Sequence, residues 1–107
     1  MVTFDHNQQE NLLTCFFNGR MDSSVGATID NELSTRISGL AKGENNLIDS
    51  RIVFDMKGVD YISSTFIRSC VSVSKQVLPG HFSIINCDPF VKKTFKIVGL
   101  DEIFNIQ

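Results

Sequence analysis

A chain of 107 residues has room for one domain, and its 42% of hydrophobic residues exclude a disordered tail or a low-complexity linker. Ten basic and twelve acidic residues give a net charge of -2 at pH 7, so the chain lacks the basic excess on which nucleic-acid binding depends. Three scattered cysteines are too few for a disulfide framework or a zinc knuckle. We therefore expect a single domain over residues 1–107 that needs no metal or other cofactor and binds no nucleic acid.

Two further patterns bear on where the domain works. The N-terminal residues carry neither the basic region nor the apolar region of a secretory signal. Charged residues interrupt every stretch that is long enough to cross a bilayer. These patterns predict a cytoplasmic domain without membrane insertion, and they leave its oligomeric state open between a monomer and a weak dimer.

The N-terminal third predicts a hairpin followed by a helix. Apolar runs at residues 2–6 and 12–18 are typical of short strands, and the polar segment 7–11 between them is typical of a turn. The second run is apolar almost throughout, which favours a strand covered on both faces. Asp22, Ser23 and Ser24 are all suitable N-cap residues, and the apolar residues behind them recur at helical spacing and predict a helix over about 24–38.

The middle of the chain predicts a strand and a helix after a loop. Residues 39–50 are rich in Gly and Asn, as loops are. The β-branched and aromatic run at 51–56 favours a central strand. Three hydroxyl residues, Ser63–Thr65, then open a helical pattern that continues to about residue 78, where a Pro-Gly pair stops it.

The C-terminal third predicts a strand at 81–86 and a further helix. Asp88 is a suitable N-cap, and Pro89 follows at the first helical position, where a missing N–H costs nothing. We expect this helix to end near Gly99. The apolar run at 103–106 is long enough for an additional edge strand. The helix residues expected to face inward are Phe90, Val91, Phe95 and Val98.

The order of these elements predicts an α/β fold. A hairpin is followed by alternating helices and strands, and βα units of this kind form parallel strands. We therefore expect a mostly parallel sheet of four to five strands with helices packed against it.

Enzymatic motifs are absent from the chain. There is no phosphate-binding glycine loop of either common type. Ser64, Asp55 and His81 are the nearest approach to a catalytic set. A nucleophile elbow, however, needs small residues two positions before and after its serine, and Ile62 and Phe66 stand there. We therefore expect a protein that is not an enzyme.

The hydroxyl cluster Ser63–Thr65 has two interpretations. A hydroxyl at a helix start caps the helix by accepting a backbone N–H, which contributes roughly 1 kcal/mol. One cap explains one residue, not three. A hydroxyl at a helix start is also a suitable phosphoacceptor, because the positive end of the helix dipole tolerates the added charge.

Four segments together resemble the STAS family, the domain of sulfate-transporter tails and bacterial anti-sigma factor antagonists. Gly19–Asp22 is similar to the family's G-x-[LV]-D motif, and residues 52–62 resemble its signature strand and following loop. Ser63–Thr65 falls where the family carries D-S-[ST]-G. Val98–Phe104 resembles the family's G-L-x-x-[LI]-F close. The resemblance implies the STAS fold.

The resemblance also implies a partner and a switch. In that family a free-standing domain of this size usually binds an anti-sigma factor with serine-kinase activity, and phosphorylation of the second motif residue breaks the complex. That residue corresponds to Ser64, with Ser63 and Thr65 as alternates. The partner-facing surface implied by the family comprises Asp22, Ser23, Ser24, Ser63, Ser64, Thr65, Phe66 and Ile67.

Two departures from the family motif leave alternatives open. Ser63 replaces the motif's Asp, and Phe66 replaces its Gly. Phe66 either closes the core or, if exposed, forms a large apolar contact beside the switch. We accordingly expect an anti-sigma factor antagonist that serine phosphorylation turns off. The alternative is a non-switching accessory subunit of a transport ATPase or a signalling scaffold.

Overall fold

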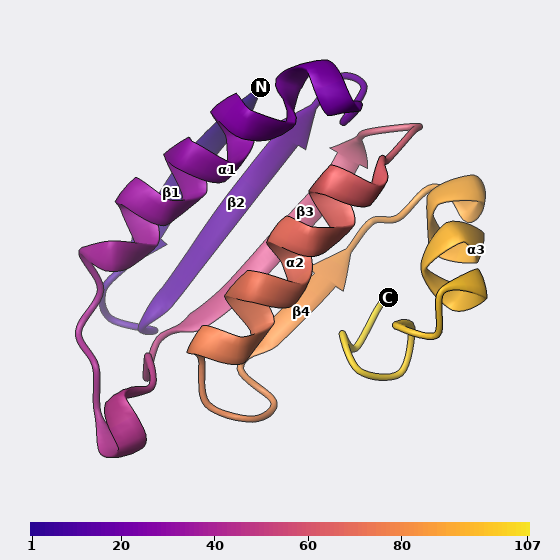
Figure 1. Ribbon diagram of the computed structural model, residues 1–107. Helices are drawn as coiled ribbons and strands as arrows, with labels where there is room; N and C mark the ends of the chain where they lie inside the picture. The colour runs from indigo at the N-terminus through magenta and orange to yellow at the C-terminus, as the bar shows by residue number, and fades with distance from the viewer.

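A computed structural model describes all 107 residues and gives four strands and three α-helices (Figure 1). In chain order the elements are β1 Val2–Asn7, β2 Leu12–Asn18, α1 Ser23–Ser38, the short 3-10 turn η1 Glu44–Asn46, β3 Arg51–Gly58, α2 Ser64–Gln76, β4 Phe82–Ile85 and α3 Pro89–Ile97. Apart from the edge strand at 103–106, the strands and helices expected from the sequence all form, and the α/β fold class is confirmed. None of the helices combines the length and apolarity that a membrane span requires.

The four strands form one sheet in the order β1-β2-β3-β4. β1 pairs antiparallel with β2, whereas β2 with β3 and β3 with β4 are parallel. The predicted hairpin followed by βα units is therefore confirmed. The C-terminal run at 103–106 adds only one isolated bridge, between Ile106 and Ile84, and not a fifth strand.

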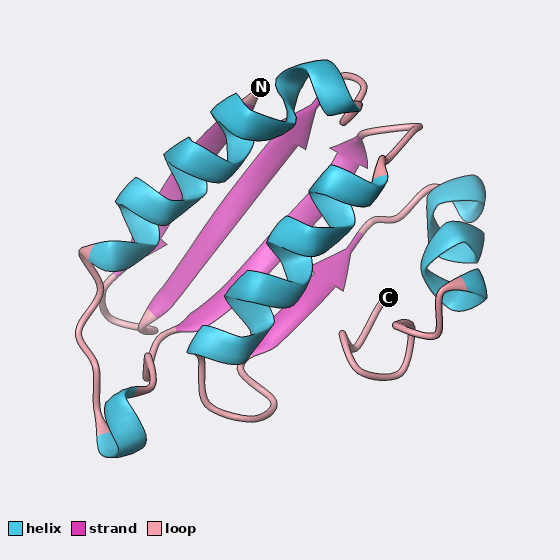
Figure 2. Cartoon of the chain, viewed as in Figure 1, coloured by secondary structure: helices cyan, strands magenta, loops and turns pink.

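Helices α1 and α2 cover the same face of the sheet, and α3 lies beside the β4 edge (Figure 2). Side chains of β2 accordingly alternate: Leu13, Cys15 and Phe17 are buried, whereas Phe16 is 42% exposed. The expectation that this strand is covered on both faces is wrong, because no helix packs across the second face.

A row of aromatic rings runs through the core beneath the helices. Phe17 packs edge-to-face on Phe54 and on Phe66, with ring centroids 4.8 and 5.1 Å apart. Phe82 continues the row, 4.9 Å from Phe54, and Phe104 follows at 5.5 Å from Phe82. Phe66 is therefore a core residue, which decides between its two interpretations in favour of the first.

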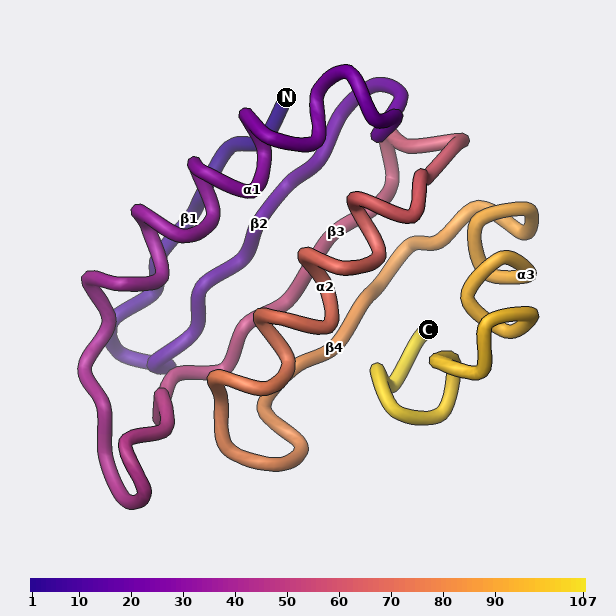
Figure 3. Tube along the Cα trace, in the orientation of Figure 1, coloured from indigo at the N-terminus to yellow at the C-terminus, as the bar shows by residue number.

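The C-terminal segment turns back after α3 and closes the end of the core (Figure 3). Gly99 permits the turn because its φ is +77°, in the region that favours glycine. Val91 and Phe95 of α3 point inward as expected, but Phe90 and Val98 are exposed. The helix has only nine residues, and it buries a single narrow face formed by Val91 and Phe95, which are four positions apart. Side chains on either side of that face lie in the solvent.

All three cysteines are free thiols, with Cys15 and Cys70 buried and Cys87 half-buried. Burial raises the pKa of the Cys15 thiol to about 12 and that of Cys87 to about 11. The thiols therefore stay protonated at neutral pH and behave as small apolar side chains.

Replacing Phe66 by alanine should strongly destabilise the fold. The ring is 2% exposed and contacts two other core rings, and truncating a buried phenylalanine costs about 3–5 kcal/mol. Phe90→Ala is the matched control, because Phe90 also lies in the first turn of a helix but is 57% exposed. Urea denaturation of both variants measures the difference. Equal losses in the two would contradict the core position of Phe66.

Candidate functional site

Two loops bring the starts of α1 and α2 side by side. The Met21 N–H donates to the Tyr61 carbonyl at 3.0 Å, and the Ser63 N–H donates to the Met21 carbonyl at 2.8 Å. Met21 and Ile62 thus form an isolated parallel bridge beyond the ends of β2 and β3. Because each helix begins two residues after this bridge, both helix starts lie at the same end of the sheet (Figure 1).

Helices α1 and α2 approach each other closely at Gly26. A Cβ built on Gly26 would lie 2.4 Å from the Cγ2 methyl of Thr65, so only glycine fits between the helices here. One turn further on, the Ser69 hydroxyl donates to the Asp30 carboxylate at 2.8 Å. These contacts fix the first turns of the two helices relative to each other.

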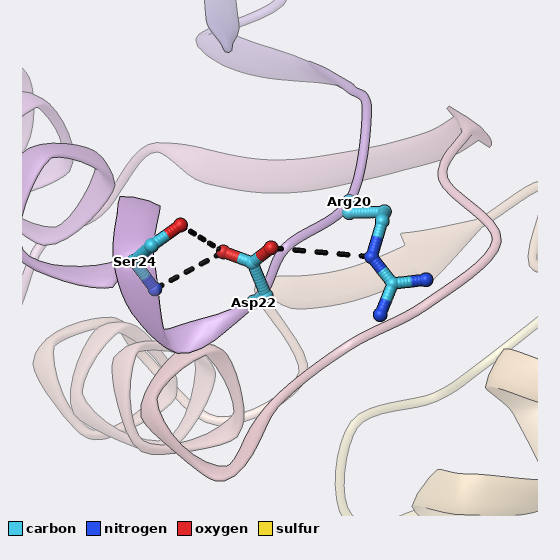
Figure 4. Close-up of polar contacts among 3 residues, drawn as sticks. All are labelled: Arg20, Asp22 and Ser24. Atoms are coloured by element: carbon cyan, nitrogen blue, oxygen red, sulfur yellow. Dashed lines mark hydrogen bonds and ion pairs between the residues drawn. The ribbon is translucent and has the colours of Figure 1, made fainter.

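Asp22 caps α1 and pairs with Arg20 of the same loop (Figure 4). Its Oδ1 accepts from the backbone N–H of Ser24 at 3.0 Å and from the Ser24 hydroxyl at 2.6 Å. The Arg20 Nε lies 3.9 Å from Oδ2, and its guanidinium stacks 4.2 Å above the Tyr61 ring. The Ser24 hydroxyl bond, with help from backbone N–H groups and Arg20, holds the pKa of Asp22 below its ordinary value.

The three hydroxyls at the start of α2 have three different environments. Ser63 is buried, and its Oγ caps the helix by accepting from the Phe66 N–H at 3.3 Å. Thr65 is half-buried, with its methyl against α1 and its Oγ1 accepting from Arg68 Nη2 at 3.3 Å. Ser64 is exposed, and its hydroxyl takes part in no hydrogen bond within the protein. Capping and accessibility therefore belong to different residues.

The eight residues predicted to face a partner differ in exposure. Ser23, Ser24 and Ser64 are exposed, and Asp22, Thr65 and Ile67 are half-buried. Ser63 and Phe66 are buried beneath them. The accessible part of this set forms one surface over the two helix starts, which we call the helix-start surface: Asp22, Ser23, Ser24, Ser64, Thr65 and Ile67.

The structure does not bring Ser64, Asp55 and His81 together. The Asp55 carboxylate accepts from Asn86 Nδ2 at 3.2 Å, and His81 Nδ1 lies 2.9 Å from the Asp49 carbonyl. Ser64 follows β3 and His81 precedes β4, so these two residues lie at opposite ends of a parallel strand pair. A serine-based acyl transfer cannot be assembled from these three side chains.

The sequence did not predict the contacts of three residues near the helix-start surface. Arg20 and Tyr61 stack across the two loops, and Arg68 reaches back over the first turn of α2. Arg68 could have been found, because it stands four positions after Ser64 and residues so spaced share a helix face. The stacking of Arg20 on Tyr61 depends on loop pairing that no local pattern reveals.

A cleft of about 790 Å³ lies beside Arg20, at the carboxyl ends of the parallel strands. Ligands of open α/β sheets bind in this position, so the strand order predicts where such a cleft forms. Its lining mixes cations and carboxylates and contains no set of groups aimed at one ligand. The residues are Gly19, Arg20, Lys57, Gly58, Val59, Asp60, Asn86, Cys87 and Asp88.

The parallel sheet, the paired loops and the twin helix starts define the class of this protein. The family model of the STAS domain matches residues 3–107, and the chain belongs to the STAS domain family. The family resemblance in the four sequence segments is thereby confirmed.

Individual relatives agree with the family assignment. The chain is 28% identical over 99 residues to BtrV of Bordetella bronchiseptica, a proposed anti-sigma factor antagonist, covering 91% of this chain and 78% of BtrV. A STAS domain protein from Planctomyces limnophilus superimposes with a TM-score of 0.79 at 16% identity, over 99% of this chain and 87% of the other.

The anti-sigma factor antagonist SpoIIAA has the same fold in two forms. Its unphosphorylated form superimposes with a TM-score of 0.75 at 16% identity, over 100% of this chain and 86% of SpoIIAA. The phosphorylated form from Bacillus gives 0.67 at 14% identity, over 100% and 89%. These TM-scores establish a common fold for the two proteins.

Gly26→Ala should destabilise the protein although alanine favours helices. The added methyl meets Thr65, and overpacking of this kind costs typically about 1–3 kcal/mol, against a helix gain of up to about 1 kcal/mol. The double variant Gly26→Ala/Thr65→Ser removes the opposing methyl and should lose less relative to Thr65→Ser alone. Thermal denaturation of the four proteins measures this coupling. If Gly26→Ala lowered the melting temperature as much in Thr65→Ser as in the wild type, the close approach of Gly26 and Thr65 would be contradicted.

Asp22→Ala should destabilise the protein at pH 7 because the first turn of α1 loses its cap. Asp22→Asn keeps an acceptor oxygen but loses the charge. The folded-state pKa of Asp22 is depressed, so the contribution of the charge is present above the unfolded-state pKa. It is lost as the pH falls through the folded-state pKa. The difference in melting temperature between wild type and Asp22→Asn should therefore shrink on acidification. A constant difference would contradict this role of the charge.

Proposed function

We propose that this STAS domain is an anti-sigma factor antagonist with no enzymatic activity of its own. It binds a kinase-type anti-sigma factor through the helix-start surface and is released when Ser64 is phosphorylated. One observation carries the proposal: of the three hydroxyls at the start of α2, only that of Ser64 is both exposed and free of internal hydrogen bonds. The exchange takes place in the cytoplasm, because ATP is the phosphate donor.

The relatives support the general role of an anti-sigma factor antagonist. BtrV bears the name of an anti-sigma factor antagonist, and SpoIIAA is an antagonist whose fold is known with and without phosphate. In the family motif the phosphoacceptor is the second residue, which corresponds to Ser64 in this chain.

The local structure is suited to a charge switch. Ser63 caps α2 with its own hydroxyl, so modification of Ser64 leaves the cap in place. A phosphate brings a charge of about -1.5 to -2, and a partner packed over the helix starts would have to desolvate it. Each 1.4 kcal/mol of such a penalty weakens binding about tenfold, so a few kcal/mol suffice to dissociate the complex.

The chemistry of the switch is a phosphoryl transfer from ATP. The Ser64 Oγ forms a bond to the γ-phosphorus while the bond to the β,γ-bridging oxygen breaks and ADP leaves. The hydroxyl proton passes to a base of the kinase. The antagonist contributes only the acceptor and its presentation at the helix start.

A second function is a non-switching accessory subunit of a transport ATPase or a signalling scaffold. Two departures from the family motif favour it, namely Ser63 in place of Asp and Phe66 in place of Gly. The missing carboxylate changes the field around Ser64 and weakens one signal that a cognate kinase can recognise.

Incubation with ATP and a kinase-type anti-sigma factor of the native host should add one phosphate to the wild type and none to Ser64→Ala. Intact mass spectrometry measures both. The phosphorylated protein should bind the anti-sigma factor at least a hundredfold more weakly, which corresponds to about 2.7 kcal/mol. Ser72→Glu, which places a charge at another exposed serine of α2, should bind as the wild type does.

No mass gain, or a gain that survives Ser64→Ala, would contradict the switch at this position. Co-purification from the native host separates the two functions. A histidine-kinase-like anti-sigma factor supports the antagonist, whereas recovery of a transport ATPase supports the accessory subunit.

A further inference from the structure

Arg68 lies folded back over the first turn of α2. Its Nη2 donates to Thr65 Oγ1 at 3.3 Å, one turn towards the start of the helix. Side chains on a helix lean towards the N-terminus, so this direction is natural for a long side chain. The hydrogen bond therefore places the guanidinium beside the segment that presents Ser64.

Ser64 and Arg68 are helical neighbours. Residues four apart stand on the same face of a helix, with Cβ atoms about 5–6 Å apart. Both residues are exposed, and the Ser64 hydroxyl makes no hydrogen bond that a phosphate would have to break. A phosphate on this hydroxyl would extend from the helix start into the space that the guanidinium reaches.

The guanidinium of Arg68 has no carboxylate partner. The only ion pair in the protein joins Arg20 to Asp22, and α2 itself contains no acidic residue. Asp30, on the facing helix, accepts from Ser69. An arginine carries five N–H donors in a planar fork, and here a single bond to Thr65 is in use.

We infer that Arg68 binds the phosphate when Ser64 is phosphorylated. This inference rests on the proposed function and names the residue that holds the switched-off state. The guanidinium moves from the Thr65 hydroxyl to the phosphate oxygens and donates two parallel hydrogen bonds to them. The phosphate is then held by Arg68 and by the positive end of α2 together.

The consequence concerns how phosphorylation turns the protein off. With its charge held by Arg68, the phosphate leaves the first turn of α2 folded. Binding is lost because the partner meets a fixed, charged group on the helix-start surface. Without Arg68 the added charge would have only the helix end to stabilise it.

The experiment uses the full chain with phosphoserine inserted at position 64 during translation. Titration followed by 31P NMR should show that the second ionisation of the phosphate is roughly threefold more favourable in the wild type than in Arg68→Gln, because a nearby cation favours the dianion. Lys75→Gln is the matched control. It removes the same charge from the same helix, eleven positions from Ser64, and should titrate as the wild type does.

A second measurement separates this contact from a general effect on folding. Phosphorylation should lower the melting temperature more in Arg68→Gln than in the wild type, and the two unphosphorylated proteins should melt alike because Arg68 is exposed. Arg68→Lys retains the positive charge but lacks the planar guanidinium. Its loss of melting temperature on phosphorylation should lie between those of the wild type and Arg68→Gln. Equal phosphate ionisation in the wild type and Arg68→Gln would overturn the inference.

The failure of this inference and that of the proposed function are distinguishable. Because translation installs the phosphoserine, the titration does not depend on any kinase. Absence of kinase modification would overturn the proposed switch and leave the measured Arg68 contact standing. Unchanged ionisation would overturn the Arg68 contact and leave kinase modification of Ser64 standing.

Discussion

The backbone pairing between Met21 and the segment Tyr61–Ser63 is the constraint on which the helix-start surface depends. It extends the parallel pairing of β2 and β3 past the ends of the strands, so two loops that are distant in sequence leave the sheet together. Each loop then enters a helix after two residues. Without this pairing, the first turns of α1 and α2 would still form. Their relative position would then depend on the helix contacts at Gly26 and Ser69 alone.

The motif departures at Ser63 and Phe66 have structural consequences that remain inside the protein. Ser63 supplies the helix cap through its hydroxyl, as an aspartate carboxylate would, but without adding a charge. The Phe66 ring fills space against Phe17 and Phe54. Both residues are buried. The two replacements therefore leave the exposed hydroxyl of Ser64 in place on the surface. Relative to the family motif, they change only the electrostatic field around that hydroxyl, because one carboxylate is missing.

Local patterns predicted the elements well because each depends on neighbouring residues. Capping residues and helical spacing located α1 and α2, and Asp88 with Pro89 located the start of α3. The errors concern long-range packing. Phe16 was expected to be covered, but whether a helix crosses the second face depends on where α3 docks. The helix-start surface was predicted through the family motif, whereas the stacking of Arg20 on Tyr61 arises from loop pairing that the sequence does not display.

A switch that acts through one added charge needs a rigid surface around it, because a mobile surface would let a partner reorganise and avoid the charge. The helix-start surface meets this condition on both of its helices. On α1, Asp22 is held by two hydrogen bonds from Ser24 and lies near Arg20. On α2, the methyl of Thr65 is packed against Gly26 of α1. Ser64 precedes Thr65 in the same first turn of α2. A phosphate at this position therefore changes the charge of the surface while the backbone beneath it stays where it is.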